Sequence, residues 1–141
     1  MKIRTDFVTN SSSSSFITVM IQTVDGKIYH GGYDSGNNSM MGDEDFSPNV
    51  KFFENLKDCG ELVEAMKTWF ANNFADTSLP EEFDYSEGQL DEIKSIEMSD
   101  VKKITISSMI DYEEYSFGSD ITYDYETKKR KRVKTGQDFE C

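Results

Sequence analysis

The feature that most constrains the fold is an alternating segment at residues 16–23 that is followed by an Asp-Gly pair. Its aliphatic residues occupy every second position: Ile17, Val19 and Ile21. Successive side chains of a strand point to opposite faces, so this pattern predicts a strand that is buried on one side. Asp25-Gly26 is typical of a tight turn because glycine accepts positive φ, and the alternation restarts at residues 27–30. The sequence therefore predicts a β-hairpin here.

The composition of the whole chain favours strands over helices. Ile and Val number 17 and the aromatic residues 18, whereas Leu and Ala together number only 7. Branched and aromatic side chains suit a pleated surface, while Leu and Ala favour helices. Further strand patterns occur at residues 101–110 and 121–125, and residues 130–134 run back after a turn at 126–129. We expect an α+β fold with a mostly antiparallel sheet of about five strands, whose order the sequence does not give.

One main amphipathic helix is expected, over about residues 59–73. Asp58 can cap its N-terminus, and Glu61 three residues later completes a reciprocal capping pattern. One face of this helix carries Leu62, Ala65, Met66, Trp69, Phe70 and Asn73. The spacing predicts that this face packs on the sheet, with Trp69 as its largest buried side chain.

The segments outside these patterns suggest the domain boundaries. Residues 1–15 end in five serines, whose hydroxyls compete for backbone hydrogen bonds, so this segment is expected to be extended or mobile. Residues 16–135 form the single predicted domain and residues 136–141 a tail. Within the domain we expect a long loop from Gly31 to Asn49 and a linker at residues 76–92, with a short turn of helix near residues 89–94. Phe52 and Phe53 are expected to form a short strand or to pack beneath the next element.

The charge is large, negative and unevenly distributed. The formal net charge is −12, and because residues 128–141 hold six basic and two acidic residues, residues 1–127 carry −16. A surface this negative repels phosphate backbones, so we expect no nucleic-acid partner, and it attracts a basic protein partner. No apolar stretch has membrane-spanning length and no export signal is visible, which predicts a cytoplasmic protein without a membrane partner. The oligomeric state stays open.

No group of residues predicts catalysis, a cofactor or a metal site. Cys59 and Cys141 form no C-x-x-C pair, and His30 is the only histidine, which argues against zinc and favours reduced thiols. The helix start would make Cys59 more acidic, but its acidic neighbours oppose that effect. Gly31-Gly32 lacks the spacing of a phosphate loop, and His30 beside it is read as a strand-end residue.

Several acidic residues and late tyrosines are the candidates for partner binding: Asp43, Glu44, Asp45, Glu81, Glu82, Tyr112 and Tyr115. The acidic triplet at 43–45 either holds a hard cation or is a solvated loop. The frame that starts at Asp34 has Gly36 where an EF-hand needs a ligand, which favours the loop. The tyrosines form either a binding face or half-buried aromatics of the sheet.

The basic run at residues 128–134 has two interpretations. It either recognises a partner or is structural, since Asp120, Asp124 and Glu126 on the partner strand of the hairpin would face it. Lysines also protect an edge strand from pairing with other chains.

The first residues carry a distinctive string, Lys2-Ile3-Arg4-Thr5-Asp6-Phe7-Val8-Thr9-Asn10, then five serines and Phe16-Ile17. This string resembles the block K-x-R-x-x-F-V-[ST]-N-S-S-S-S-S-F that opens small uncharacterised bacterial and phage proteins. The resemblance covers about 17 of the 141 residues. It implies a bacterial or phage cytoplasmic origin, but neither an activity nor site residues. The serine tract is then either a recognition or processing tag or a spacer.

Three functions follow as hypotheses. The first is a non-catalytic interaction module, of the inhibitor, immunity or adaptor type, that binds a basic partner. The second is a substrate of modification or a structural component that uses the tract from Ser11 to Ser15. The third is an enzyme whose site is assembled from dispersed residues.

Overall fold

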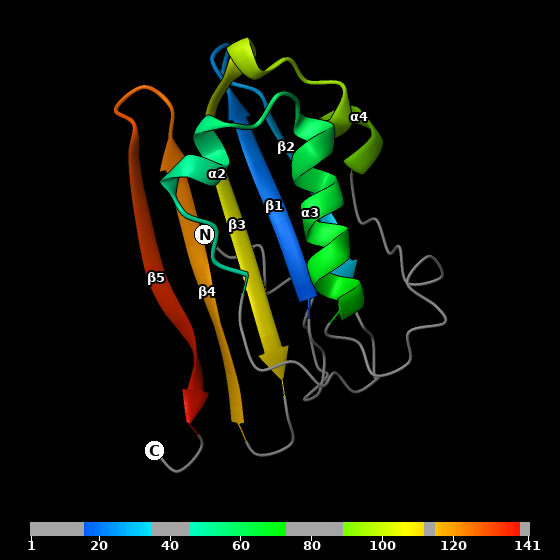
Figure 1. Cartoon of the computed structure of the whole chain (residues 1–141), viewed down its shortest axis with the longest axis vertical. Helices are drawn as coiled ribbons and strands as arrows, with labels where there is room; N and C mark the ends of the chain where they lie inside the picture. The colour runs from blue at the N-terminus through cyan, green and yellow to red at the C-terminus, as the bar shows by residue number, and fades with distance from the viewer. Residues whose placement is uncertain (1–15, 35–45, 73–88, 112–114, 139–141) are drawn as a thin grey trace.

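The computed structural model describes residues 16–34, 46–72, 89–111 and 115–138, and shows an antiparallel sheet with helices on one face (Figure 1). The elements are β1 Phe16–Thr23, β2 Ile28–Asp34, α2 Val50–Glu54, α3 Cys59–Asn72, α4 Leu90–Lys94, the single 3₁₀ turn η1 Met98–Asp100, β3 Val101–Asp111, β4 Tyr115–Asp124 and β5 Lys129–Asp138. The predicted α+β class, with five antiparallel strands and one main helix, is confirmed.

The strand order is β2-β1-β3-β4-β5, which places β1 inside the sheet. Val19 lies opposite Gly31 of β2 on one side and opposite Ile106 of β3 on the other. The hairpin predicted at residues 16–30 therefore forms, and its first strand also pairs with a strand more than 80 residues later in the chain. This second pairing is the connection that the sequence pattern did not show.

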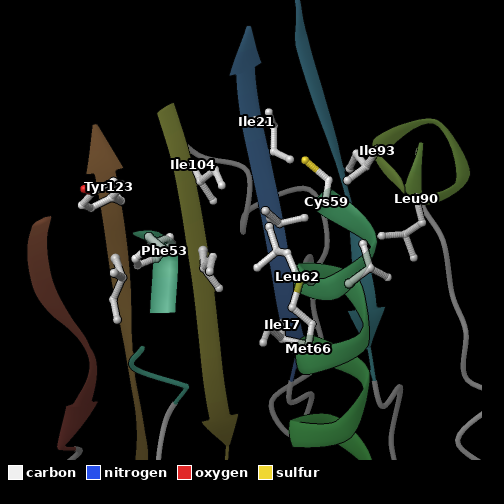
Figure 2. Close-up of a cluster of buried hydrophobic side chains, with 14 of the residues drawn as sticks. Ile17, Ile21, Phe53, Cys59, Leu62, Met66, Leu90, Ile93, Ile104 and Tyr123 are labelled. Carbon is white, nitrogen blue, oxygen red and sulfur yellow. The ribbon is translucent and has the colours of Figure 1, made fainter. Parts of the chain in front are cut away.

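The core lies between the helices and the face of the sheet that carries the odd-numbered residues of β1. Ile17, Val19 and Ile21 contribute from β1, as the alternation predicted, and Ile104 and Ile106 contribute from β3. Figure 2 shows Leu62 and Met66 of α3 packed toward Ile17, while Phe53 and Tyr123 lie beyond Ile104. Phe16 and Thr18, on the opposite face, are buried as well. The first half of β1 is thus buried on both sides, in contrast to the one-sided burial that its alternation predicted.

Helix α3 packs over β1 and β2 with a face slightly different from the predicted one (Figure 1). Its buried residues are Cys59, Leu62, Val63, Met66 and Phe70. Trp69 is only half-buried and contacts Phe46 edge-to-face, with 6.3 Å between ring centroids. The prediction that Trp69 is the largest buried side chain was wrong. The buried face is centred nearer to Val63, so Trp69 lies at its edge.

The N-terminus of α3 is capped by Asp58, as predicted. Its Oδ1 accepts a hydrogen bond from the Glu61 amide at 2.9 Å. The Glu61 carboxylate reaches back one residue further than the reciprocal pattern requires, since its Oε1 accepts from the Lys57 amide at 2.8 Å. Both bonds satisfy amide groups near the helix start that have no partner within the helix.

Phe52 and Phe53 lie in the short helix α2 and not in a strand. Asn49 caps this helix by accepting from the Phe52 amide at 3.0 Å. Phe53 is fully buried and stacks on Tyr123 of β4, with ring centroids 5.0 Å apart and planes at 2°. Of the two predicted alternatives, packing beneath a neighbouring element is therefore the correct one.

The segment that was expected to be a loop from Gly31 begins as a strand. Gly31 and Gly32 belong to β2, where a Cβ on Gly32 would lie 2.3 Å from the Ile17 carbonyl oxygen. A Cβ on Gly31 would lie 3.1 Å from Cγ of Leu90 in α4. These glycines allow β2 to approach β1 and α4 closely, whereas the sequence suggested a loop between elements. The short helix predicted near residues 89–94 is confirmed as α4.

The β4–β5 hairpin forms, but its charges are arranged differently from the prediction. In the register, Asp124 lies opposite Lys129 and Asp120 lies opposite Val133, while Glu126 lies in the turn. The Asp124 carboxylate accepts from the Glu126 amide at 2.8 Å, and this bond is the main cause that lowers the pKa of Asp124. The strand β5 continues to Asp138, three residues beyond the predicted domain boundary.

None of the helices in the described part of the chain has the length and apolarity that crossing a membrane requires.

We expect Phe53→Ala to lower the free energy of unfolding by about 3–5 kcal/mol, because it removes a fully buried ring and leaves a cavity beside Tyr123. Urea unfolding followed by circular dichroism measures this loss. The control is Lys51→Ala on the exposed side of the same helix, which should change stability by less than about 0.5 kcal/mol. Equal losses in the two variants would show that Phe53 does not anchor α2.

The two adjacent glycines of β2 should respond differently to alanine. Gly32→Ala places its methyl group against the backbone of β1, which cannot move without disturbing the sheet, so a loss of about 1–3 kcal/mol or more is expected. Gly31→Ala mainly meets the side chain of Leu90, which can adjust, and should cost less. Thermal unfolding of both variants tests this order, and the reverse order would contradict the register of β1 and β2.

Candidate functional site

The best candidate for a binding site is a hollow of about 450 Å³. Its lining residues belong to the end of the sheet where β1 turns into β2 and to the segment that begins in α4; Figure 1 shows where these elements lie. Two segments that are distant in the sequence form it: residues 23–29 at the β1–β2 turn, and residues 92–100, which run from α4 into η1. We call it the acidic hollow. Its lining residues are Thr23, Val24, Asp25, Lys27, Tyr29, Glu92, Ser95, Ile96, Glu97 and Asp100.

The β1–β2 turn is held rigidly at the edge of the acidic hollow. The Thr23 amide donates to the Lys27 carbonyl at 2.9 Å, and Gly26 adopts a φ of 93°, which favours glycine. The Val24 amide donates to the Asp100 carbonyl at 2.8 Å and so joins the turn to η1. The Thr23 hydroxyl donates to the Asp25 carboxylate. These bonds fix Asp25 and Asp100 relative to each other.

Helix α4 is fixed by its buried side and by the residue that precedes it. Leu90 and Ile93 are buried in the core. The Gln89 amide donates to the His30 carbonyl at 2.9 Å, while the Gln89 side-chain oxygen accepts from the His30 amide at 3.2 Å. Gln89 therefore pairs with the edge of β2 in place of another strand. This attachment places Glu92 beside the β1–β2 turn.

The electrostatic character of the acidic hollow is strongly negative. Four acidic side chains line it, from Asp25, Glu92, Glu97 and Asp100, against the single ammonium group of Lys27. The hydrogen bond from the Thr23 hydroxyl is the largest cause that lowers the pKa of Asp25, and bonding and attraction from Lys27 act in the same direction. Asp25 thus stays ionised well below neutral pH.

The shape of the acidic hollow suits an organic cation better than a metal ion. Val24, Tyr29 and Ile96 add apolar surface between the acidic groups. Over residues 16–34, 46–72, 89–111 and 115–138, no group of three or more His, Cys, Asp or Glu side chains is arranged to hold a metal. A lysine or arginine side chain has both parts that this surface can contact, an aliphatic stem and a charged end.

A second hollow of about 430 Å³ lies on the other side of Val24. It is lined by Val24, Met98, Ser99, Val101, Lys102, Tyr125 and Glu126. Val24 is 63% exposed and belongs to both hollows, so its side chain stands between them. This second hollow has one lysine and one glutamate among its lining residues, so it lacks the excess of acidic groups of the first.

Cys59 has the surroundings of a structural thiol. It is fully buried, and its Sγ lies 3.7 Å from the Sδ of Met98. Burial, reinforced by the charge of Asp58, raises the pKa of the thiol from 9.0 to about 11. The neighbouring Tyr125 donates its hydroxyl to the Phe53 carbonyl at 2.9 Å, and burial raises the pKa of this phenol too. A protonated, enclosed thiol is a poor nucleophile.

His30 is not positioned as a partner for Cys59. In the register of β1 and β2 it lies opposite Met20, on the face of the sheet away from the core that contains Cys59. Its Nδ1 is buried and has no hydrogen-bond partner among the described residues. Cys59 and His30 therefore do not form a pair for nucleophilic catalysis.

Most residues that the sequence indicated for partner binding lie outside the described residues. These are Asp43, Glu44, Asp45, Glu81, Glu82 and Tyr112. Tyr115 begins β4, where it lies opposite Asp138 of β5. Their assignment to a binding surface stays a prediction.

The acidic hollow consists of residues that the sequence did not single out. Asp25 was recognised only as part of a turn, and Glu92, Glu97 and Asp100 are scattered through a segment rich in charge. The available signal was the run of acidic residues on both sides of α4. It could not locate a site, because the position of η1 beside the β1–β2 turn depends on the pairing of β1 with β3.

The chain matches no protein-family model, no curated protein and no solved structure in comparisons with each of these groups. What this end of the molecule binds is therefore inferred from its own geometry and charge.

We expect the contribution of Cys59 to stability to decrease as the pH rises from about 9 to about 11. The folded state holds the thiol protonated up to about 11, whereas the unfolded chain ionises from the ordinary value of 9.0, so rising pH favours unfolding. Urea unfolding across this range, compared with Cys59→Ala, isolates the effect from other titrating groups. If the difference in stability between the two proteins did not change with pH, the burial of Cys59 would be contradicted.

Proposed function

We propose that this chain is a non-catalytic interaction module, of the inhibitor, immunity or adaptor type, that holds a basic segment of a partner protein in the acidic hollow. One observation carries the proposal: four acidic residues from two segments that are distant in the sequence line one hollow together with apolar and aromatic surface. The hydrogen bond from Val24 to Asp100 and the attachment of α4 by Gln89 hold these segments in place. A preorganised surface loses less entropy on binding.

The charge of the whole chain supports the same kind of partner. Residues 1–127 carry a net charge of −16, which attracts a basic protein over distances of about one Debye length, roughly 8–10 Å at ordinary salt. The acidic hollow then provides short-range contacts for an ammonium or guanidinium group. The same field disfavours a nucleic-acid partner. The long-range charge thus sets the association rate, and the hollow sets the specificity.

The setting that we propose is the cytoplasm of a bacterium or of a phage-infected cell. The resemblance of residues 2–16 to the opening block of small bacterial and phage proteins supports this setting. The pattern of two widely separated cysteines is compatible with a reducing compartment, and Cys59 is enclosed as a free thiol.

A labelled basic peptide, Gly-Arg-Gly-Leu-Arg-Gly, tests the proposal by fluorescence anisotropy. We expect Glu97→Gln/Asp100→Asn to weaken its binding tenfold or more, because hydrogen bonds to charged groups contribute about 1.5–3 kcal/mol each. The matched control, Glu54→Gln/Glu64→Gln, removes the same charge from exposed positions of α2 and α3 and should weaken binding less than about threefold.

Two outcomes would contradict the proposal. The first is no binding of the basic peptide by the unmodified chain at low salt. The second is an equal loss in the two double variants, which would assign the binding to diffuse charge and not to the acidic hollow.

A further inference from the structure

The strand β5 forms one edge of the sheet. It runs from Lys129 to Asp138 and follows β4 in the strand order. No strand in the described parts of the chain pairs with its outer side. The side chains of residues 131–134 are exposed, and Val133 is 47% exposed. An edge strand of this kind presents amide and carbonyl groups that can bond to an additional strand.

The opposite edge of the sheet differs. There the main chain of His30 in β2 is bonded on its outer side by Gln89, through both the backbone amide and the side-chain oxygen of the glutamine. A strand that approached β2 would have to displace these bonds. Among the described residues, β5 is therefore the edge that is open to another strand, and Figure 1 shows it at the far left of the sheet.

The charges of β5 are divided between its two faces. Lys129, Lys131 and Val133 alternate on the face away from the helices, since Lys131 lies opposite Thr122 and Val133 opposite Asp120. Arg132 and Lys134 lie on the helix side. Arg130 also lies on that side. Its side chain donates hydrogen bonds to the Pro48 carbonyl at 2.7 Å and to the Ser47 hydroxyl at 3.0 Å, so its role is structural.

We propose that β5 binds an extended acidic segment of a partner protein, which adds to the sheet as a sixth strand. Main-chain hydrogen bonds along the outer edge of β5 would hold this segment, and its carboxylates would lie beside the exposed cations on both faces. An apolar side chain of the segment would cover Val133. This surface is independent of the acidic hollow, which lies on other elements and attracts the opposite charge.

Charge favours an acidic segment over two other possible occupants of this edge, a second copy of the chain and a nucleic acid. A second copy of the chain would set the basic run of β5 against itself, and like charges that face each other across two strands are destabilising. A nucleic acid is a long polyanion and would meet the −16 carried by the rest of the molecule. A short acidic strand can lie within the positive field of β5 alone, because the Debye length is about 8–10 Å.

The experiment uses the full chain and a labelled peptide, Thr-Glu-Val-Glu-Glu-Thr-Glu-Thr, which places an acid beside each exposed cation in an antiparallel register. Fluorescence anisotropy at 50 mM salt measures its binding. Two N-methylated forms, methylated at odd or at even positions, block one backbone edge each while they keep the charge. Strand addition predicts that one form loses binding tenfold or more and that the other keeps it.

A pair of variants locates the site. Lys129→Gln/Lys131→Gln should weaken binding of the peptide by roughly threefold or more, since facing charge pairs contribute about 0.2–1 kcal/mol each. The control Lys51→Gln/Lys57→Gln removes equal charge from exposed positions elsewhere and should leave binding nearly unchanged. Circular dichroism verifies that all four substitutions leave the sheet folded.

Four outcomes would overturn the proposal. These are equal binding of the two N-methylated forms, equal effects of the two double variants, no binding at 50 mM salt, or tighter binding of a single-stranded oligonucleotide than of the peptide. None of these outcomes depends on the acidic hollow, so the proposed function can fail or survive separately.

Discussion

The structure depends on the position of β1 between β2 and β3. A local hairpin provides the first pairing, and the second joins residues 16–23 to residues 101–109. The second pairing brings Ile104 and Ile106 beside Val19 and Ile21, so one continuous apolar face forms for α3 to cover. Contacts between residues so distant in the chain are costly to form, because the intervening loop must close first. Burial of this shared face compensates for that cost.

The sequence contained much of the fold because most elements have local signals. Alternation located the strands, Asp58 located the start of α3, and Asp25-Gly26 located the turn. The sequence patterns were misleading where tertiary packing determines the structure. Two adjacent glycines resemble a loop when read alone, yet they occur where β2 touches the backbone of β1. Trp69 was expected as the largest buried side chain of this face, whereas the face that α3 buries carries Cys59, Leu62, Val63, Met66 and Phe70 and leaves Trp69 at its edge.

The candidate site was beyond a sequence-based prediction for a related reason. Asp25 and Asp100 lie 75 positions apart, and the pairing of β1 with β3 together with the backbone bond from Val24 to Asp100 brings their segments together. With 27 acidic residues in the chain, no local pattern distinguishes the four that converge. The net charge could indicate the sign of the charge on a partner, but locating the binding site required the strand order.

The bonds between Gln89 and His30 have a consequence for assembly. Proteins with two free sheet edges can join edge to edge without limit, which produces fibres. Here Gln89 bonds to the main chain of His30 in β2 and so occupies part of one edge of the sheet. A strand of another molecule that aligned with β2 would first have to displace these two bonds, so the described residues disfavour repeated edge-to-edge addition on that side of the sheet.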